Sequence, residues 1–260
     1  MTQPTSTTFT LGSASTPLTV TERGQGRAVL LLHGGAGLIS VAAFAGLLAE
    51  ALPARVLTPV HPGFGGTPRP EELNSIGGLA ALYEALLEQQ DLEDVVVIGN
   101  SIGGWIAAEL ALRHSPRVGQ VVLVDAVGIQ VEGHPVADPF KLNLNELMAL
   151  SYFDPAPFRI DLSAIPEPQR AAMAANRVAL GVYGGQPSMG DPTLRARLEG
   201  VKVPALVLWG EADRVCDVTY GRAYAEAIPN AKFVLLERTG HVPQLETPAA
   251  LLKAIAAGLR

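Results

Sequence analysis

The sequence predicts an α/β fold built around a mostly parallel, eight-stranded sheet. Short, nearly unbroken apolar runs recur along the chain, and such runs are typical of strands that are buried on both faces. Between them lie stretches with apolar residues at three- and four-residue spacing, which predict helices. Strands that alternate with helices form parallel sheets flanked by helices. The predicted buried strands are residues 29–32, 55–57, 95–98, 121–124, 205–208 and 233–236.

The two remaining strands are expected near the start of the chain. Residues 7–11 and 17–21 alternate polar and apolar side chains, a pattern that predicts antiparallel strands at one edge of the sheet. The helices expected to flank the sheet are residues 41–51, 76–88, 102–113, 220–227 and 249–259.

The alternation of strands and helices stops after Asp125 and resumes only at Ala205. The residues between them contain two helical patterns, at 144–152 and 167–183, and no convincing buried strand. We therefore predict a helical cap inserted after the sixth strand, which packs on the sheet domain and lines an apolar pocket with some of its side chains. The predicted boundaries are 1–127 and 198–260 for the core and 128–197 for the cap.

The charge of the chain excludes one large class of function. The chain has 260 residues with a formal net charge of −6, and it contains no basic run. A protein that follows nucleic-acid phosphates needs a cluster of lysines and arginines. We therefore expect no nucleic-acid partner, and the sequence leaves the oligomeric state open.

Cysteine and histidine usage indicates neither a disulfide nor a metal. A single cysteine, Cys216, forms no intrachain disulfide and no cysteine-based zinc site, so we interpret it as a packing residue. The five histidines are dispersed without the spacing of metal ligands. The first twenty residues lack the features of a signal peptide, and the later apolar runs are too short or too interrupted to span a bilayer. We expect a cytoplasmic protein with no metal, no other cofactor and no membrane association.

One serine lies in a setting that favours nucleophilic catalysis. Residues 99–103 form a Gly-x-Ser-x-Gly motif between a predicted buried strand and a predicted helix, with Ser101 at its centre. A serine on such a tight turn needs very small neighbours two positions away on each side, and Gly99 and Gly103 meet that condition. The alternative interpretation is a glycine-rich turn in which Ser101 only caps the helix.

A serine nucleophile needs a base, and the base needs an orienting acid. His241 follows the last predicted strand and precedes the last helix, so it is the candidate base. Asp213 follows the preceding strand and gives the chain order serine, aspartate, histidine, which is the hydrolase order. Asp125, at the end of the sixth strand, remains a rival for the role of the acid.

The negative charge that develops when a serine attacks a carbonyl needs backbone N–H donors. The N–H of Ile102, at the start of the helix after Ser101, is one candidate. The loop His33-Gly34-Gly35-Ala36-Gly37 has little side-chain bulk, and we predict Gly35 as the second donor. His33 itself is interpreted as a structural, hydrogen-bonding histidine.

Together these motifs resemble those of the α/β-hydrolase fold superfamily, and the resemblance covers nearly the whole chain. The matching segments are residues 33–35, 61–67, 99–103, 210–213 and 240–243. The resemblance implies that Ser101 is the nucleophile, Asp213 the acid and His241 the base, with a cap domain after the sixth strand. His61 stands where similar enzymes often have aspartate or arginine, and no catalytic role is assigned to it.

The resemblance implies a cofactor-independent serine hydrolase that cleaves a small-to-medium, apolar carboxylic ester through an acyl-enzyme. One alternative is a carbon–carbon bond hydrolase of the meta-cleavage-product type. Those enzymes typically carry a tryptophan next to the catalytic histidine, whereas this chain has Val242, and a cap arginine for the substrate carboxylate is guessed as Arg177. A second alternative is a ligand receptor built on the hydrolase fold. In each case the expected partner is a small molecule, an acyl substrate for the hydrolase.

Overall fold

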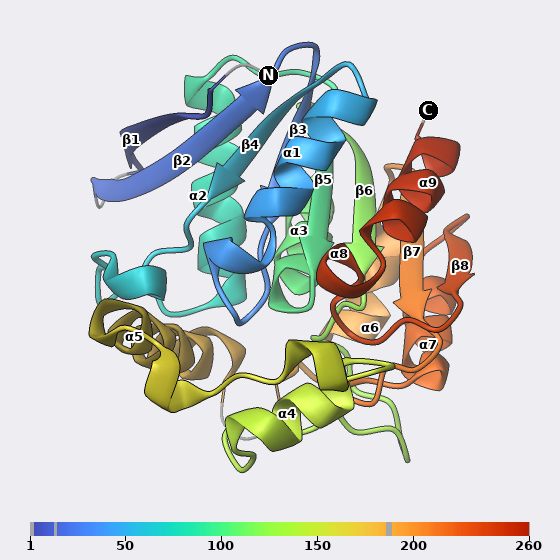
Figure 1. The fold of residues 1–260 in the computed structure, drawn as a ribbon. Helices are drawn as coiled ribbons and strands as arrows, with labels where there is room; N and C mark the ends of the chain where they lie inside the picture. Colours follow the sequence, from blue (N-terminus) through green and yellow to red (C-terminus); the bar gives the residue numbers. More distant parts are fainter. Residues whose placement is uncertain (1–2, 13–14, 186–188, 260) are drawn as a thin grey trace.

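The computed structural model describes residues 3–12, 15–185 and 189–259. Its strands form one eight-stranded sheet in the order β1-β2-β4-β3-β5-β6-β7-β8 (Figure 1). The strands are β1 (Thr5–Leu11), β2 (Thr16–Gly24), β3 (Arg27–Leu32), β4 (Ala54–Pro59), β5 (Val95–Asn100), β6 (Val118–Val124), β7 (Ala205–Gly210) and β8 (Lys232–Leu236).

The register of the sheet confirms the predicted fold class. Strands β3 to β8 pair in parallel, whereas β1 pairs antiparallel with β2 and β2 pairs antiparallel with β4. The two alternating segments at the start of the chain therefore form one edge of the sheet, as predicted. Strands β5 and β7 are buried along their whole length, which is the reason that their sequences are apolar on both faces.

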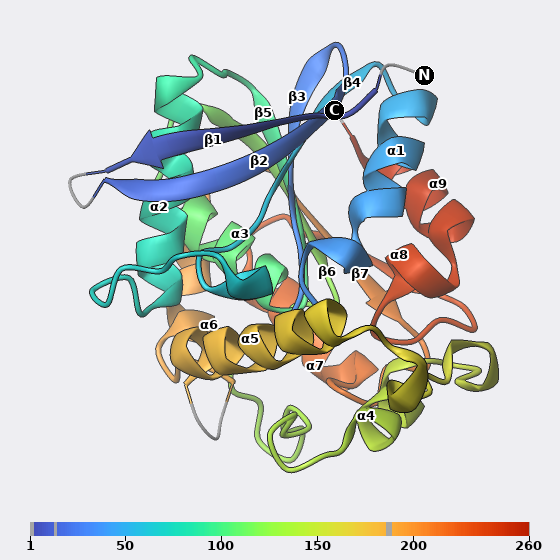
Figure 2. The same ribbon diagram turned by 60° about the vertical axis from the view of Figure 1, so that its left-hand side comes forward.

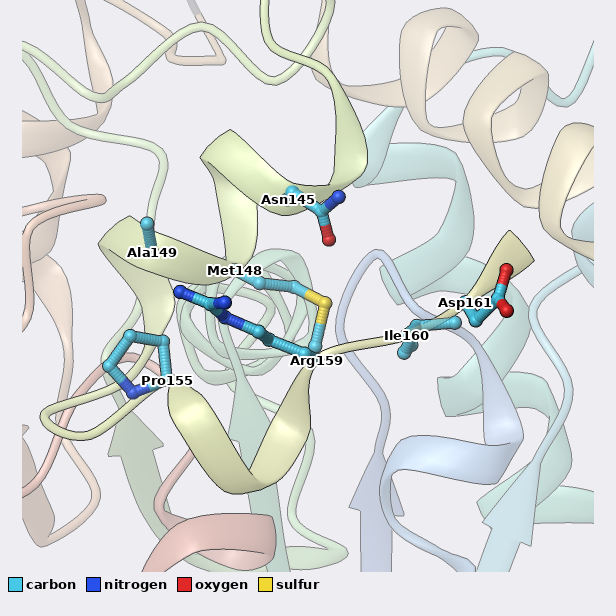
Figure 3. Close-up of a pocket in the computed structure, with 7 residues that line it drawn as sticks. All are labelled: Asn145, Met148, Ala149, Pro155, Arg159, Ile160 and Asp161. Atoms are coloured by element: carbon cyan, nitrogen blue, oxygen red, sulfur yellow. The ribbon is translucent and has the colours of Figure 1, made fainter. Parts of the chain in front are cut away.

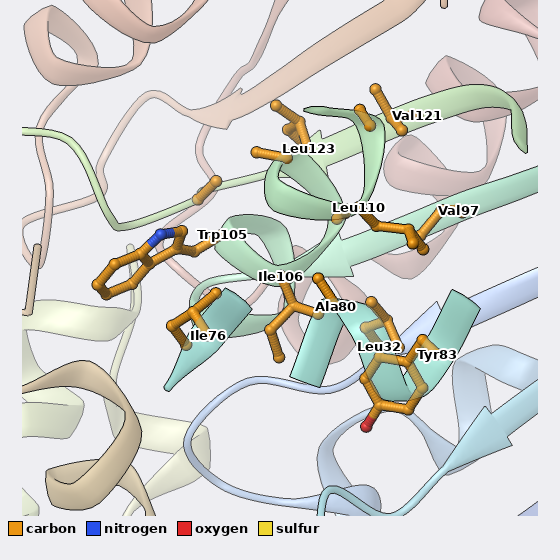
Figure 4. Packing of buried hydrophobic residues seen from close by; sticks show 14 of the residues in the cluster. Leu32, Ile76, Ala80, Tyr83, Val97, Trp105, Ile106, Leu110, Val121 and Leu123 are labelled. Carbon is orange, nitrogen blue, oxygen red and sulfur yellow. The ribbon is translucent and has the colours of Figure 1, made fainter. Parts of the chain in front are cut away.

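Helices cover both faces of the sheet. The helices that flank it are α1 (Ala42–Ala51), α2 (Ile76–Gln89), α3 (Ile102–Leu112), α7 (Val218–Ala227) and α9 (Pro248–Gly258). Helices α1 and α9 pack on one face, and α2, α3 and α7 pack on the other (Figure 2). Figure 4 shows part of the second layer, where Trp105, Ile106 and Leu110 of α3 meet side chains of α2 and of the sheet.

The residues inserted after β6 lie across the carboxyl ends of the strands, as both views of the ribbon show. This region contains the helices α4 (Leu144–Ser151), α5 (Glu167–Gly184) and α6 (Leu194–Arg197). Gly128 and Gly190 form an isolated bridge, and Asp191 N–H donates to the Gly128 carbonyl at 2.8 Å. The inserted chain therefore leaves and rejoins the core at neighbouring points.

Two four-residue helices had no counterpart in the sequence prediction. These are α6 and α8 (Pro243–Glu246), and each is too short to show a helical period of apolar residues. Among the described residues, no helix combines the length and the apolar character that crossing a bilayer requires.

Candidate active site

Ser101 occupies the sharp turn that joins β5 to α3. Its backbone has φ 56° and ψ −119°, a conformation that residues with a Cβ rarely adopt. A Cβ at Gly99 would lie 2.1 Å from the Gly103 carbonyl oxygen, and one at Gly103 would lie 2.4 Å from that of Leu32. The turn therefore forms only with glycine at both positions, as the motif predicted. The Ser101 side chain makes no capping hydrogen bond to α3, which argues against the alternative interpretation as a helix cap.

The fold brings the predicted serine, histidine and aspartate into one hydrogen-bonded chain. Ser101 Oγ donates to His241 Nε2 at 2.9 Å, and His241 Nδ1 donates to Asp213 Oδ2 at 2.8 Å. Because β5, β7 and β8 are parallel, the loops that follow them meet at one edge of the sheet. His241 and Asp213 are buried, and Ser101 is half-buried.

Backbone groups fix the carboxylate of Asp213. Its Oδ1 accepts hydrogen bonds from Val215 N–H at 2.8 Å and from Cys216 N–H at 3.1 Å, which leaves Oδ2 for His241. The thiol of Cys216 lies 3.4 Å from the same Oδ2 and 3.7 Å from His241 Nδ1. Cys216 is therefore a neighbour of the Asp213 carboxylate as well as a packing residue. Burial, and then the charge of Asp213, raise the pKa of this thiol, which opposes a nucleophilic role.

Within the described part of the chain, Asp125 forms no hydrogen bond to His241, whose Nδ1 binds Asp213. Asp125 Oδ1 accepts from Gly210 N–H at 2.7 Å, and its Oδ2 has no partner among the described residues. The side chain is fully buried, and burial, followed by the negative charge of Asp213, raises the pKa of the Asp125 carboxyl. These contacts favour Asp213 over Asp125 as the partner of the histidine.

Two side chains that the sequence prediction did not single out hold the histidine loop. Asn100 Nδ2 donates to the carbonyl of His241 at 3.0 Å and to that of Val124 at 3.2 Å. Gln244 Nε2 donates to Asn100 Oδ1 at 3.1 Å. Asn100 therefore joins the serine strand to the histidine loop, and its place directly before Ser101 is the only local signal of this contact.

The two candidate oxyanion donors are the backbone N–H groups of Gly35 and Ile102. Among the described residues, neither Gly35 N–H nor Ile102 N–H donates to another protein group. Ile102 is the first residue of α3, so its N–H has no acceptor within the helix. Gly35 lies in a turn that is closed by a 3.1 Å hydrogen bond from Gly37 N–H to the Gly34 carbonyl.

Two buried histidines fix the start of this turn. His61 N–H donates to His33 Nε2 at 3.1 Å, so the His33 proton lies on Nδ1 and is donated to the Gly34 carbonyl at 2.8 Å. His61 Nε2 donates to the His33 carbonyl at 3.0 Å and its Nδ1 accepts from the Tyr83 hydroxyl. Both rings are neutral in this network. Burial lowers the pKa of His33 to about 4 and lowers that of His61 well below its ordinary value.

We expect the two histidines to make the protein acid-labile. A buried neutral histidine takes up its proton less readily in the folded than in the unfolded chain, so its contribution to stability is complete above pH 6.5 and declines below it. Between about pH 6.5 and 5 the free energy of unfolding should fall with a slope that steepens toward a limit of about 1.4 kcal/mol per pH unit for each group. Denaturant titrations across this range measure the slope. A constant free energy of unfolding, or NMR spectra in which the His33 ring protonates near its ordinary pKa, would contradict the expectation.

The inserted region meets the candidate site through the end of α4. His241 N–H donates to the Ser151 carbonyl at 2.7 Å, and Arg214 N–H donates to the Leu150 carbonyl at 3.2 Å. The Arg214 guanidinium binds the carbonyls of Ala149 and, at 3.0 Å, of Tyr152. The exposed carbonyls at the carboxyl end of α4 are therefore satisfied by the loops that carry Asp213 and His241.

A cavity of about 410 Å³ lies in the inserted region between α4 and the chain that follows it (Figure 3). Its apolar lining is Met148, Ala149, Pro155 and Ile160, and its polar lining is Asn145, Arg159 and Asp161. The arginine that lines this cavity is Arg159. Arg177, which the sequence analysis named as the cap arginine for a substrate carboxylate, does not line it. The Arg177 guanidinium donates to the Phe140 carbonyl at 2.7 Å and lies over the Phe140 ring.

Comparison with known proteins identifies the family. A model of the alpha/beta hydrolase family matches residues 29–254, which is most of the chain. The chain belongs to the alpha/beta hydrolase family. The match contains Ser101, Asp213 and His241 as well as the inserted region.

Individual alpha/beta hydrolases resemble the chain over most of its length. It is 27% identical to the 2-hydroxy-6-oxononadienedioate/2-hydroxy-6-oxononatrienedioate hydrolase of Cupriavidus pinatubonensis, over 87% of this chain and 84% of that protein. It is 29% identical to the pimeloyl-[acyl-carrier protein] methyl ester esterase of Aromatoleum aromaticum, over 88% and 98%. The fold matches that of an esterase from Exiguobacterium antarcticum with a TM-score of 0.76, at 20% identity over 97% and 98% of the two chains.

Proposed function

We propose that the protein is a cofactor-independent serine hydrolase that cleaves a small-to-medium, apolar carboxylic ester through an acyl-enzyme. The observation that carries this proposal is the hydrogen-bonded chain from Ser101 Oγ through His241 to Asp213, at 2.9 and 2.8 Å. In this proposal Gly35 and Ile102 supply the oxyanion donors, and residues 128–197 form a cap over the acyl substrate.

The geometry supports a two-step reaction. His241 Nε2 takes the Ser101 proton as Oγ bonds to the ester carbonyl carbon, and the carbonyl oxygen becomes an oxyanion that accepts from Gly35 and Ile102 N–H. The imidazolium is stabilised by Asp213 and gives its proton to the departing alkoxide, which leaves as an alcohol. Water then attacks the acyl-enzyme, with its proton passing to His241 and back to Ser101, so that the acid is released and the serine restored.

A second candidate is hydrolysis of a carbon–carbon bond in a vinylogous diketone. One relative is named as a hydrolase of 2-hydroxy-6-oxononadienedioate, a substrate that carries carboxylates. The cavity of the inserted region is lined by the exposed Arg159 together with Asp161, Asn145 and apolar side chains, and an arginine is suited to a carboxylate. This candidate uses the same serine and histidine, so only the substrate distinguishes it from the esterase.

The test is a substrate panel. p-Nitrophenyl esters of increasing acyl length and one 2-hydroxy-6-oxo-2,4-dienoate should be assayed with the wild type and with Ser101→Ala as the blank. The proposal expects many turnovers on at least one ester and a preference that varies with chain length. Turnover of the diketone alone would establish the second candidate. One turnover or none on every substrate would instead favour a receptor on the hydrolase fold.

A further inference from the structure

Helix α5 presents one face to two loops of the core. Asn176, Leu180 and Tyr183 follow one another at helical spacing, so their side chains lie on the same side of the helix. That side contacts the loop after β3, residues 33–37, and the loop after β4, residues 61–66. Figure 2 shows α5 running directly beneath these loops. The Tyr183 hydroxyl donates to the Pro62 carbonyl at 2.9 Å, and its ring stacks on Phe64.

Asn176 joins the two loops with one amide group. Its Nδ2 donates to the Ala36 carbonyl at 2.9 Å, and its Oδ1 accepts from Gly65 N–H at 2.6 Å. Because a carbonyl only accepts and an N–H only donates, both partners fix the orientation of the amide. The side chain is buried, and a Cβ added at Gly37 would lie 2.6 Å from Asn176 Nδ2. The amide of Asn176 therefore matches both of its partners, and Gly37 leaves the space that this amide occupies.

The bond to Ala36 lies next to the candidate oxyanion donor. The network of His33 and His61 holds the turn at its base, whereas Asn176 holds it at Ala36, on the far side of Gly35. The Gly35 N–H thus lies between two anchored points. Leu180 covers the same residue, since a Cβ on Gly35 would lie 3.0 Å from Leu180 Cδ2.

We propose that Asn176 is a positioning residue, which holds the Gly35 N–H in the direction of the oxyanion by binding Ala36 and Gly65 together. The inference rests on the proposed function, because it requires that Gly35 donates to an oxyanion. It also makes the reaction depend on the cap, because the Gly35 N–H points at the oxyanion only when α5 contacts both loops.

The decisive variant is Asn176→Asp. It keeps an acceptor for Gly65 N–H, but it loses the donor to Ala36 and places a carboxylate oxygen beside that carbonyl. Removal of one oxyanion donor costs about 100- to 1000-fold in kcat, so misdirecting one should lower kcat by about 10- to 100-fold. KM should change by less than about threefold, because the lost interaction belongs to the transition state. A boronic acid that forms a tetrahedral adduct on Ser101 should lose affinity by a factor similar to that for kcat.

A matched control is Gln169→Glu, which makes the same change from amide to carboxylate on the same helix. The Gln169 side chain is exposed and makes no hydrogen bond to residues 33–37 or 61–66, all of which the structure describes. Its kcat and boronic acid affinity should stay within about twofold of the wild type, as for substitutions away from such contacts. Asn176→Ala, which removes both bonds without adding a charge, provides the test if the aspartate variant does not fold.

Several outcomes would overturn the inference. Active sites should be counted with a serine-directed phosphonate, so that kcat refers to folded protein only. An Asn176 variant with a lower melting temperature but wild-type kcat and boronic acid affinity would show a purely structural role. A changed pH profile of kcat/KM would place the effect on His241 instead. If the wild type turns over no substrate, or if Ser101→Ala retains turnover, the proposed function fails and this inference fails with it. If the wild type turns over an ester and Asn176→Asp has the same kcat and boronic acid affinity, only the inference fails.

Discussion

Replacing Ser101 with alanine is expected to leave a folded protein that has lost ester turnover by several orders of magnitude. In the proposed mechanism the serine, histidine and aspartate act as a unit, and loss of the nucleophile of such a unit abolishes nearly all of the catalysis that it provides. The remaining contacts of the turn are backbone contacts, among them Gly104 N–H to the Ser101 carbonyl at 3.0 Å, and alanine keeps them. Measurements of kcat/KM and of circular dichroism test both parts of this expectation.

Covalent labelling supplies an independent check on the same residue. A serine-directed phosphonate should modify the wild type at Ser101, as located by mass spectrometry of its peptides, and should leave Ser101→Ala unlabelled. A label at another serine, together with an active alanine variant, would move the nucleophile elsewhere.

The second large effect is expected for Asp213→Asn, with Asp125→Asn as its matched control. An asparagine at 213 removes the counter-charge of the imidazolium and favours the wrong tautomer of His241, an effect of about 10⁴-fold in the serine-protease example. At 125 an asparagine keeps an oxygen for Gly210 N–H and resembles the neutral carboxyl that burial favours. We therefore expect a large loss of kcat for the first variant and a small one for the second.

Both aspartate variants should remain folded by circular dichroism for the comparison to hold. The reverse ranking would assign the acid to Asp125 and leave the roles of Ser101 and His241 unchanged. Equal, large losses would show that both carboxyl groups contribute, and would contradict the assignment of a single acid.

The sequence located the strands because they carry their own signal, but its prediction of a buried strand at 233–236 was wrong. Strand β8 lies at the edge of the sheet, and only Leu236 of it is buried. The buried runs at β5 and β7 are apolar throughout, and the glycines around Ser101 are required by contacts within one strand–turn–helix unit. Local composition is enough to locate such elements. The four-residue helices α6 and α8 lack that signal, since one turn of helix is too short for a periodic pattern.

The partners around the candidate site depend on which strands are neighbours, and the sequence does not contain this information in a local form. Asp125 and Asp213 both follow buried strands, and their hydrogen-bond partners separate them: Asp125 accepts from Gly210 N–H, whereas Asp213 accepts from His241. Asn176 is a further case: a buried asparagine in line with Leu180 and Tyr183 on one helix face is a visible pattern, but its two loop partners are distant in the chain.

The positive φ of Ser101 has a thermodynamic consequence. A residue with a Cβ held in such a conformation costs about 1–3 kcal/mol, whereas glycine adopts it without that strain. If Ser101 is the nucleophile, as proposed, stability and activity select different amino acids at position 101. Glycine relieves the strain of the turn but has no hydroxyl, and alanine keeps the strain and also lacks a hydroxyl. With serine at position 101 the free energy of unfolding is lower, by the cost of this strain, than it would be with glycine. Packing in the rest of the core must offset that cost to keep a hydroxyl at the tip of β5.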